Sequence, residues 1–167
     1  MRALPRLLAL LSLLLGVPAV RAAEEQVWLR SFDAGGQPYD LSAERGRVVA
    51  LTFASRHTRD EAEEVNDTLS AQAGEDFQVV SVVDFMDVPQ IGRGSARKQV
   101  AQHDRPGRIQ FLVDDTGQLK RSFHVDPRSR VDILVIDQHG VLRGRYAGIG
   151  QLDDALREID QLRKEQP

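Results

Sequence analysis

Residues 46–67, GRVVALTFASRHTRDEAEEVND, predict a strand, a sharp turn and a helix in immediate succession. Residues 48–53 form a nearly continuous apolar run, which is typical of a central strand covered on both faces. The apolar residues that follow recur at helical spacing, at Ala62, Val65 and Leu69. Thr58 and Glu61 have the T-x-x-E spacing of a capping box, so the helix is predicted to begin near Thr58. In α/β folds, the turn between such a strand and helix is a common place for functional groups.

The rest of the chain alternates between strands and helices and ends with a hairpin and a helix. Strands are predicted over residues 27–32, 77–85, 109–113, 131–137 and 141–146, and helices over 95–103, 118–123 and 151–163. Ser95 is expected to cap the second helix. The sequence contains no internal repeat and no low-complexity segment, so it predicts one α/β domain over residues 23–167.

Residues 1–22 have the features of a secretory signal peptide. Arg2 and Arg6 supply positive charge, residues 7–17 are apolar but too few to span a bilayer comfortably, and small residues surround the end of the segment. We therefore expect cleavage after Ala22 and a periplasmic protein, with an uncleaved anchor as the alternative. No cysteine follows the apolar run, so a lipoprotein anchor is not expected, and no other segment is long enough to cross a membrane.

Charge and cysteine content exclude several classes of function. Loss of Arg2, Arg6 and Arg21 with the signal peptide would take the net charge from -3 to -6. An acidic chain argues against general nucleic-acid binding, which needs a basic face. The chain contains no cysteine, whereas thiol–disulfide exchange and thiol peroxidase chemistry need a thiolate. These redox activities are therefore excluded for this chain acting alone.

Residues 41–49, followed by Phe53-Ala54-Ser55, resemble the start of a thioredoxin-like domain of the TlpA and peroxiredoxin-related kind. The resemblance implies a thioredoxin-like fold from about residue 27 to 163, with a single mixed central sheet flanked by helices. In redox-active members a Cys-x-x-Cys pair follows the A-S-x step, and its two positions fall here on His57 and Asp60. The proline that precedes the fourth strand in those members is replaced by Val131.

Four short motifs narrow the resemblance to the YtfJ-type family. They lie at residues 54–58, 91–97, 111–117 and 135–140. The resemblance implies an exported thioredoxin-like protein that lacks the catalytic cysteines, and it gives no defined activity and no cofactor.

In thioredoxin-like folds, the start of this helix and the loop before the fourth strand form one groove. The candidate groove residues here are Arg56, His57, Thr58, Asp60, Arg130, Val131 and Asp132. Arg128 adds further positive charge, so we expect a basic groove that attracts an acidic or carboxylate-bearing protein or peptide partner. The alternative is that these arginines pair with neighbouring acids, namely Glu61, Glu64 or Asp132, and leave nothing for a ligand.

His57 is the residue of most chemical interest, because it occupies the position of the attacking cysteine. The helix dipole there disfavours a positive charge, and a neutral imidazole can act as a base, a ligand or a hydrogen-bonding group. The alternative is an ordinary, partly exposed histidine. A cysteine-free enzyme built on Arg56, His57 and Asp60 would need an orienting carboxylate and a pocket. The sequence identifies no such partner, which favours a non-catalytic binding module.

Metal and anion sites have weaker support. The histidines lie on four different segments without metal-binding spacing, so neither a metal nor a cofactor is predicted. The turn of Gly92, Arg93, Gly94, Ser95 and Arg97 opens a predicted helix, and its N–H groups and basic side chains make it a candidate anion site. The alternative is a flexible loop followed by a capped, solvated helix.

Overall fold

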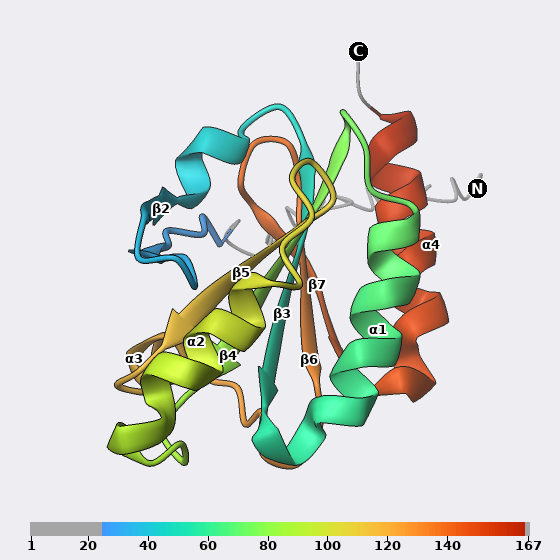
Figure 1. The fold of residues 1–167 in the computed structure, drawn as a ribbon. Coiled ribbons are helices and arrows are strands. Elements are labelled where there is room, and N and C mark those ends of the chain that lie inside the picture. The colour runs from blue at the N-terminus through green and yellow to red at the C-terminus, as the bar shows by residue number, and fades with distance from the viewer. Residues whose placement is uncertain (1–24, 166–167) are drawn as a thin grey trace, which may run out of the picture.

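The structure is a computed structural model that describes residues 25–165, so the predicted signal peptide lies outside the described residues (Figure 1). The strands are β1 (Arg30–Phe32), β2 (Pro38–Asp40), β3 (Val48–Ser55), β4 (Phe77–Asp84), β5 (Ile109–Asp114), β6 (Asp132–Ile136) and β7 (Leu142–Ala147). The α-helices are α1 (Arg59–Ala71), α2 (Arg93–Ala101), α3 (Gln118–Ser122) and α4 (Leu152–Lys164). Short 3-10 turns are η1 (Leu41–Glu44), η2 (Arg56–Thr58), η3 (Gln90–Gly92) and η4 (Ile149–Gln151). No helix within residues 25–165 is long and apolar enough to cross a membrane.

The central sheet has the strand order β5-β4-β3-β6-β7 and is mixed, as predicted. β3 pairs in parallel with β4, and β4 with β5, whereas β6 is antiparallel to both of its neighbours. All eight residues of β3 are buried, as expected for a central strand. This arrangement brings the carboxyl ends of β3, β4, β5 and β7 to one edge, at the bottom of Figure 1. We call this the carboxyl edge.

Alternate side chains of β3 pack into two different cores. Val48, Ala50 and Ala54 face α1 and α4, which lie side by side on one face of the sheet (Figure 1). Val49, Leu51 and Phe53 point to the other face, where the N-terminal segment and the end of α3 cover them. The period-2 alternation of a strand explains this division. α2 covers the outer part of the first face, through Ala96 and Val100 above the ends of β4 and β5.

Most predicted elements are confirmed within a few residues, but the details of three elements were wrong. The capping box pairs Ser55 with Thr58 around η2, and α1 itself has no side-chain cap from Thr58. α2 begins at Arg93, so Ser95 lies inside the helix and does not cap it. The first strand is shorter than predicted, because β1 starts at Arg30 and pairs with the unpredicted β2. A short turn precedes α1 and a hairpin shortens the first strand, whereas α2 extends back into the predicted turn.

Candidate functional site

The turn after β3 is fixed to the loop before β6 by buried hydroxyl groups. Ser55 Oγ accepts from the His57 N–H (3.1 Å), and Thr58 Oγ1 accepts from the Ser55 N–H (3.0 Å). Both hydroxyls donate to the Pro127 carbonyl, at 2.8 and 2.9 Å. Because Ser55 and Thr58 are buried, this double attachment holds the turn that carries His57 in one conformation.

Glu61 ties three segments together at the same place. Its carboxylate accepts from the Val131 N–H (2.8 Å) before β6 and from the Ile149 N–H (3.0 Å) after β7. Gly148 has φ of 71°, and a Cβ there would lie 2.9 Å from Glu61 Oε1, so the turn requires glycine. Glu61 therefore acts as a structural bridge, and among the described residues it forms no ion pair with the arginines that line the same cavity.

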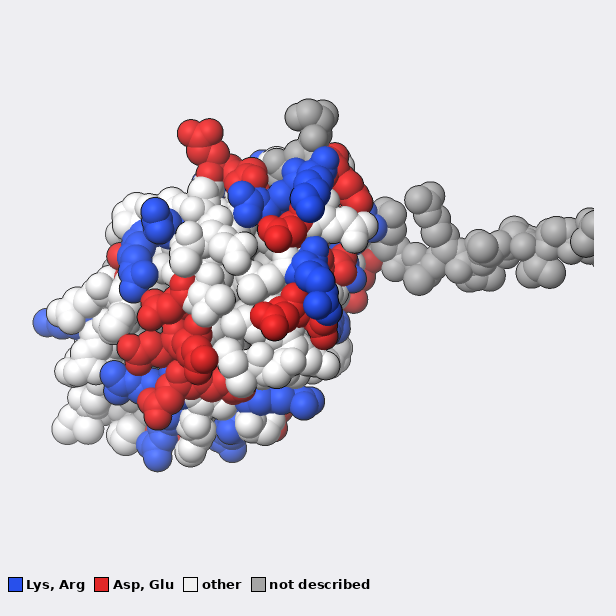
Figure 2. All heavy atoms as spheres, turned by 90° about the vertical axis from the view of Figure 1, so that its right-hand side faces the viewer, with Lys and Arg blue, Asp and Glu red and all other residues white. Residues whose placement is uncertain are grey.

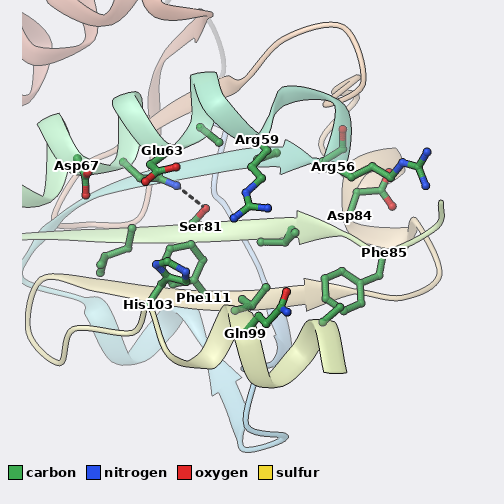
Figure 3. A pocket seen from close by; sticks show the side chains of 18 of the residues that line it. Arg56, Arg59, Glu63, Asp67, Ser81, Asp84, Phe85, Gln99, His103 and Phe111 are labelled. Carbon is green, nitrogen blue, oxygen red and sulfur yellow. Dashed lines mark hydrogen bonds between the residues drawn. The ribbon is translucent and has the colours of Figure 1, made fainter. Parts of the chain in front are cut away.

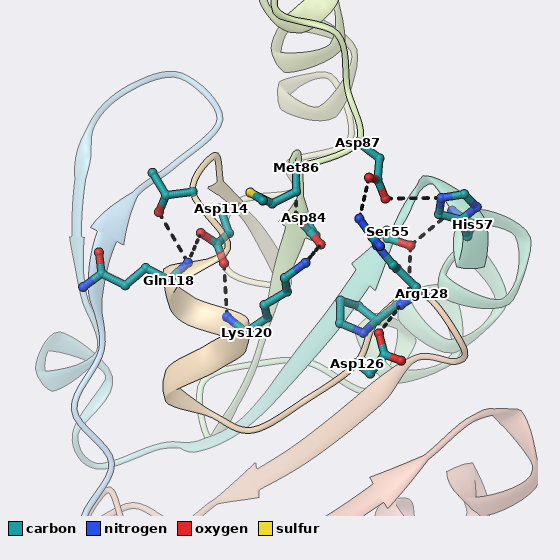
Figure 4. A network of polar contacts seen from close by, with 12 residues as sticks. Ser55, His57, Asp84, Met86, Asp87, Asp114, Gln118, Lys120, Asp126 and Arg128 are labelled. Atoms are coloured by element: carbon teal, nitrogen blue, oxygen red, sulfur yellow. Dashed lines mark hydrogen bonds and ion pairs between the residues drawn. The ribbon is translucent and has the colours of Figure 1, made fainter.

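His57 has a carboxylate partner that the sequence did not reveal. Its Nε2 lies 3.3 Å from Oδ2 of Asp87, in the loop between β4 and α2, and its side chain is 44% exposed (Figure 4). The same carboxylate pairs with Arg128 at 2.5 Å, and the Asp87 carbonyl accepts from Arg56 at 3.2 Å. The only sequence signal for Asp87 was its place after a buried strand, where α/β folds gather functional side chains.

A row of polar residues crosses the carboxyl edge beside this site. Ser55, Asp84 and Asp114 are neighbours in register on β3, β4 and β5. Asp84 pairs with Lys120 at 2.5 Å, and Asp114 accepts from the Gln118 and Lys120 N–H groups (Figure 4). Both carboxylates are buried and fully engaged, so they fix the loops and offer no free chemistry.

The structure brings only some of the predicted groove residues together. Arg56, His57, Thr58 and Asp60 line a shallow cavity of about 280 Å³ with Arg59, Glu61 and Ser129. Val131 is fully buried and contributes only its N–H, to Glu61. Arg130 and Asp132 lie outside the cavity lining. Burial raises the pKa of the Asp132 carboxyl, and the charges near it are those of Arg130, Asp126 and Arg145, not His57.

The edge of this cavity keeps unpaired positive charge. Within residues 25–165, Arg56 and Arg59, which line the cavity, form no ion pair, and neither does Arg130 outside its lining, while Arg128 pairs with Asp87. Figure 2 shows acidic side chains gathered in the middle of the face formed by α1 and α4, with basic side chains along its lower edge. The lower edge corresponds to the carboxyl edge of the sheet. The basic groove predicted from the sequence is thus compatible with the described charges.

Large apolar side chains are exposed around the same edge. Ile91 is fully exposed and Met86 is 43% exposed, both in the segment between β4 and α2, and Ile149 is 42% exposed in η4. Ile149 lies next to the cavity, because its N–H binds Glu61. Exposed apolar residues beside a charged groove are typical of a surface that contacts another protein.

Nucleophilic chemistry has little support at this site. The hydroxyls that surround His57 belong to Ser55, Thr58 and Ser129. The first two donate to the Pro127 carbonyl and the third donates to the Asp126 carbonyl. A histidine activates a hydroxyl only when the hydroxyl can donate to it. Within residues 25–165, none of these three hydroxyls therefore donates to His57.

The candidate anion site is organised differently from the prediction. Arg93 donates to the Val88 carbonyl at 3.1 Å and lies 3.9 Å from the Asp115 carboxylate. Arg97 also pairs with Asp115 and stacks over the Phe85 ring. The two arginines thus attach α2 to the turn after β5. Among the described residues, no group of three acidic, histidine or cysteine side chains is arranged to hold a metal.

Comparison with known proteins identifies the fold. No family model and no curated protein matches the sequence. Similar solved structures include an exposed lipoprotein thioredoxin from Streptococcus pneumoniae, at 21% identity and a TM-score of 0.64, covering 81% of this chain and 100% of that one. A protein assigned as the thiol:disulfide interchange protein DsbE from Chlorobium tepidum has 22% identity and a TM-score of 0.64, with coverage of 84% and 96%. A thioredoxin-like superfamily protein has 17% identity and a TM-score of 0.70, with coverage of 87% and 100%. This chain therefore has a thioredoxin-like fold, although its sequence contains no cysteine.

Proposed function

We propose that this chain is an exported, YtfJ-type thioredoxin-fold protein that binds an acidic segment of a partner protein at its carboxyl edge. The observation that carries the proposal is the former cysteine position itself. His57 and Asp60 stand there on an ordered, exposed turn beside arginines without ion pairs. The site keeps the geometry of a binding groove and has no thiol with which to act on what it binds. The likeness to an exposed lipoprotein thioredoxin supports the exported location.

The rigidity of the groove supports a binding role. Ser55 and Thr58 fix η2 to the loop before β6 through buried hydrogen bonds, and Glu61 adds a partly buried bond to that loop and an exposed one to the loop after β7. A surface that is already ordered loses less conformational entropy when a partner binds. The binding surface proposed here therefore exists before the partner arrives.

The residues around the groove at the carboxyl edge indicate the chemistry of the partner. Arg56 and Arg130 supply charge, and Ile91 and Ile149 supply apolar contact area. Binding energy at protein interfaces concentrates in a few such residues, and complementary charge mainly governs the association rate and selectivity. An acidic segment with at least one large apolar side chain fits this surface.

A histidine-based enzyme is the second candidate, and one observation favours it. The orienting carboxylate that such chemistry requires is present, because Asp87 lies 3.3 Å from His57. With no available hydroxyl, the histidine would have to activate water on a bound substrate. Asp87 is shared with Arg128, which pairs with it at a shorter distance, so the binding role remains the better supported one.

Photo-crosslinking in the native compartment tests the binding role. A photoreactive residue replaces Ile91 at the carboxyl edge or, as the matched control, exposed His139 in the hairpin at the opposite end. We expect a discrete adduct from position 91 and none from position 139. Equal adducts from both positions, or none from position 91, would contradict the proposal. Hydrolytic turnover that is lost in both His57→Gln and Asp87→Asn would instead support the enzyme.

A further inference from the structure

A second cavity lies between α1, α2 and the outer strands and meets the groove cavity at Arg56 and Arg59, which line both (Figure 3). Its volume is about 240 Å³, slightly below the ~300–1,000 Å³ that is usual for drug-sized ligands. Its apolar lining includes Val83, Val88, Val100 and Phe111, which are only half-buried. We call this cavity the inter-helix cleft. Its size suits a small molecule.

The base of the cleft contains a directed chain of hydrogen bonds. The Thr52 hydroxyl donates to Asn66 Oδ1 at 2.9 Å, and Asn66 Nδ2 donates to Ser81 Oγ at 3.0 Å (Figure 3). All three residues are buried, and Ser81 is fully so. The Ser81 hydroxyl proton has no acceptor among the described residues. Because Ser81 is fully buried and bonded to Asn66, this chain of hydrogen bonds fixes the base of the cleft.

Positive charge stands at one end of the cleft. Arg59 extends from the first turn of α1 into the space above β4 (Figure 3) and has no ion pair or hydrogen bond within residues 25–165. At the other end, Arg105 is occupied by Asp67, at 3.2 Å, and Glu63 lies between the two ends on α1. The cleft is therefore positively charged at the end that contains Arg59 and more acidic towards Glu63 and Asp67.

We propose that the inter-helix cleft binds a small carboxylate with an apolar tail. The carboxylate lies against Arg59, and the tail lies over Val100 and Phe111. The acids Glu63 and Asp67 disfavour the reverse orientation. An arginine without a competing acid is the preferred partner of a carboxylate, because its planar donors match the two oxygens. The cleft shares Arg59 with the groove cavity, but its apolar part is separate, since α2 and the β5 residue Phe111 contribute nothing to the groove cavity.

Titration with octanoate, followed by the amide chemical shifts of nitrogen-labelled protein, tests the proposal. Octanoate has the expected carboxylate and tail, and octylamine has the same tail with the opposite charge. We expect saturable shifts for Val83, Val100 and Phe111, and at least about tenfold weaker binding of octylamine, as a charge-assisted hydrogen bond would give. Equal binding of the two probes, absence of saturable shifts with octanoate, or shifts confined to other surfaces would each overturn the proposal.

Two variants separate the roles of shape and charge. Ala96→Phe places a ring from α2 into the cleft and should abolish octanoate binding while the groove is unchanged. Arg59→Gln should weaken octanoate about tenfold. The matched control Lys98→Gln removes a positive charge from an exposed position of α2 outside the cleft lining and should have no effect. Wild-type affinity in both Ala96→Phe and Arg59→Gln would contradict the site, whatever the outcome for the partner groove.

Discussion

Two arginine-rich turns lie at the same end of this molecule. The arginines of one turn form no ion pairs among the described residues, and those of the other turn do. At the start of α1, Arg56 and Arg59 form no ion pair within the described residues, although Asp60 and Glu61 follow them in the first turn, and Glu61 is engaged by backbone N–H groups. At the start of α2, Arg93 and Arg97 converge on Asp115. Whether the arginines are paired depends on the direction of the neighbouring carboxylates. It does not depend on the number of arginines. A basic turn is a candidate site only when the fold directs its acids elsewhere.

The largest expected effect concerns the strand that carries the first turn. Phe53→Ala removes a buried ring from β3, and we expect unfolding free energy to fall by about 3–5 kcal/mol. Chemical denaturation measures this loss. Phe32→Ala is the matched control, because Phe32 is 59% exposed and its loss should have little effect. A loss at Phe53→Ala as small as the one expected at Phe32→Ala would mean that β3 does not form the core.

A smaller loss is expected when Glu61 no longer bridges the three segments. Glu61→Ala leaves the N–H groups of Val131 and Ile149 without their acceptor, and we expect a destabilisation of about 2–4 kcal/mol. Glu61→Gln keeps one acceptor oxygen and should lose less. Glu64→Ala, on the exposed side of the same helix, is the control and should change stability by less than about 0.5 kcal/mol. If Glu61→Ala matched that control, the groove would not depend on the bridge.

Removing the acid from the second turn should make it resemble the first. Asp115→Ala releases Arg93 and Arg97, at a stability cost of about 0–1 kcal/mol, because the pairs are partly exposed. We expect measurable phosphate binding in this variant and none in the wild type, with calorimetry as the measurement. Absence of phosphate binding in Asp115→Ala would show that ion pairing alone does not separate the two turns.

The smallest effect concerns Asp132, which was predicted as a groove residue. Burial raises the pKa of its carboxyl above the unfolded value, so folding disfavours the ionised form. This destabilisation is present above the folded pKa and vanishes as pH falls below the unfolded pKa of about 3.9. Asp132→Asn should therefore raise the melting temperature at pH 7 and lose that advantage near pH 3. An advantage that persists at pH 3 would mean that titration is not its cause.

The sequence predicted the fold better than the site, for a physical reason. A buried strand and an amphipathic helix show themselves in local patterns, so β3, α1 and α4 were located to within a few residues. The site depends on contacts between distant segments. Glu61 binds Val131 across 70 positions, and Asp87 reaches His57 from another loop. The local sequence pattern predicted that Glu61 belongs to a capping box. In the structure, its carboxylate instead binds the loops that contain Val131 and Ile149.

The central claim is that a cysteine-free groove at the carboxyl edge binds an acidic partner. The most direct test measures binding of the segment crosslinked at position 91 to the double reversal Arg56→Glu with Arg130→Glu. The control is Arg157→Glu with Lys164→Glu on α4, which changes the net charge by the same amount. We predict that the groove variant loses binding with a nearly unchanged melting temperature, while the control binds like the wild type. Equal affinity of the two variants for that segment would contradict the account.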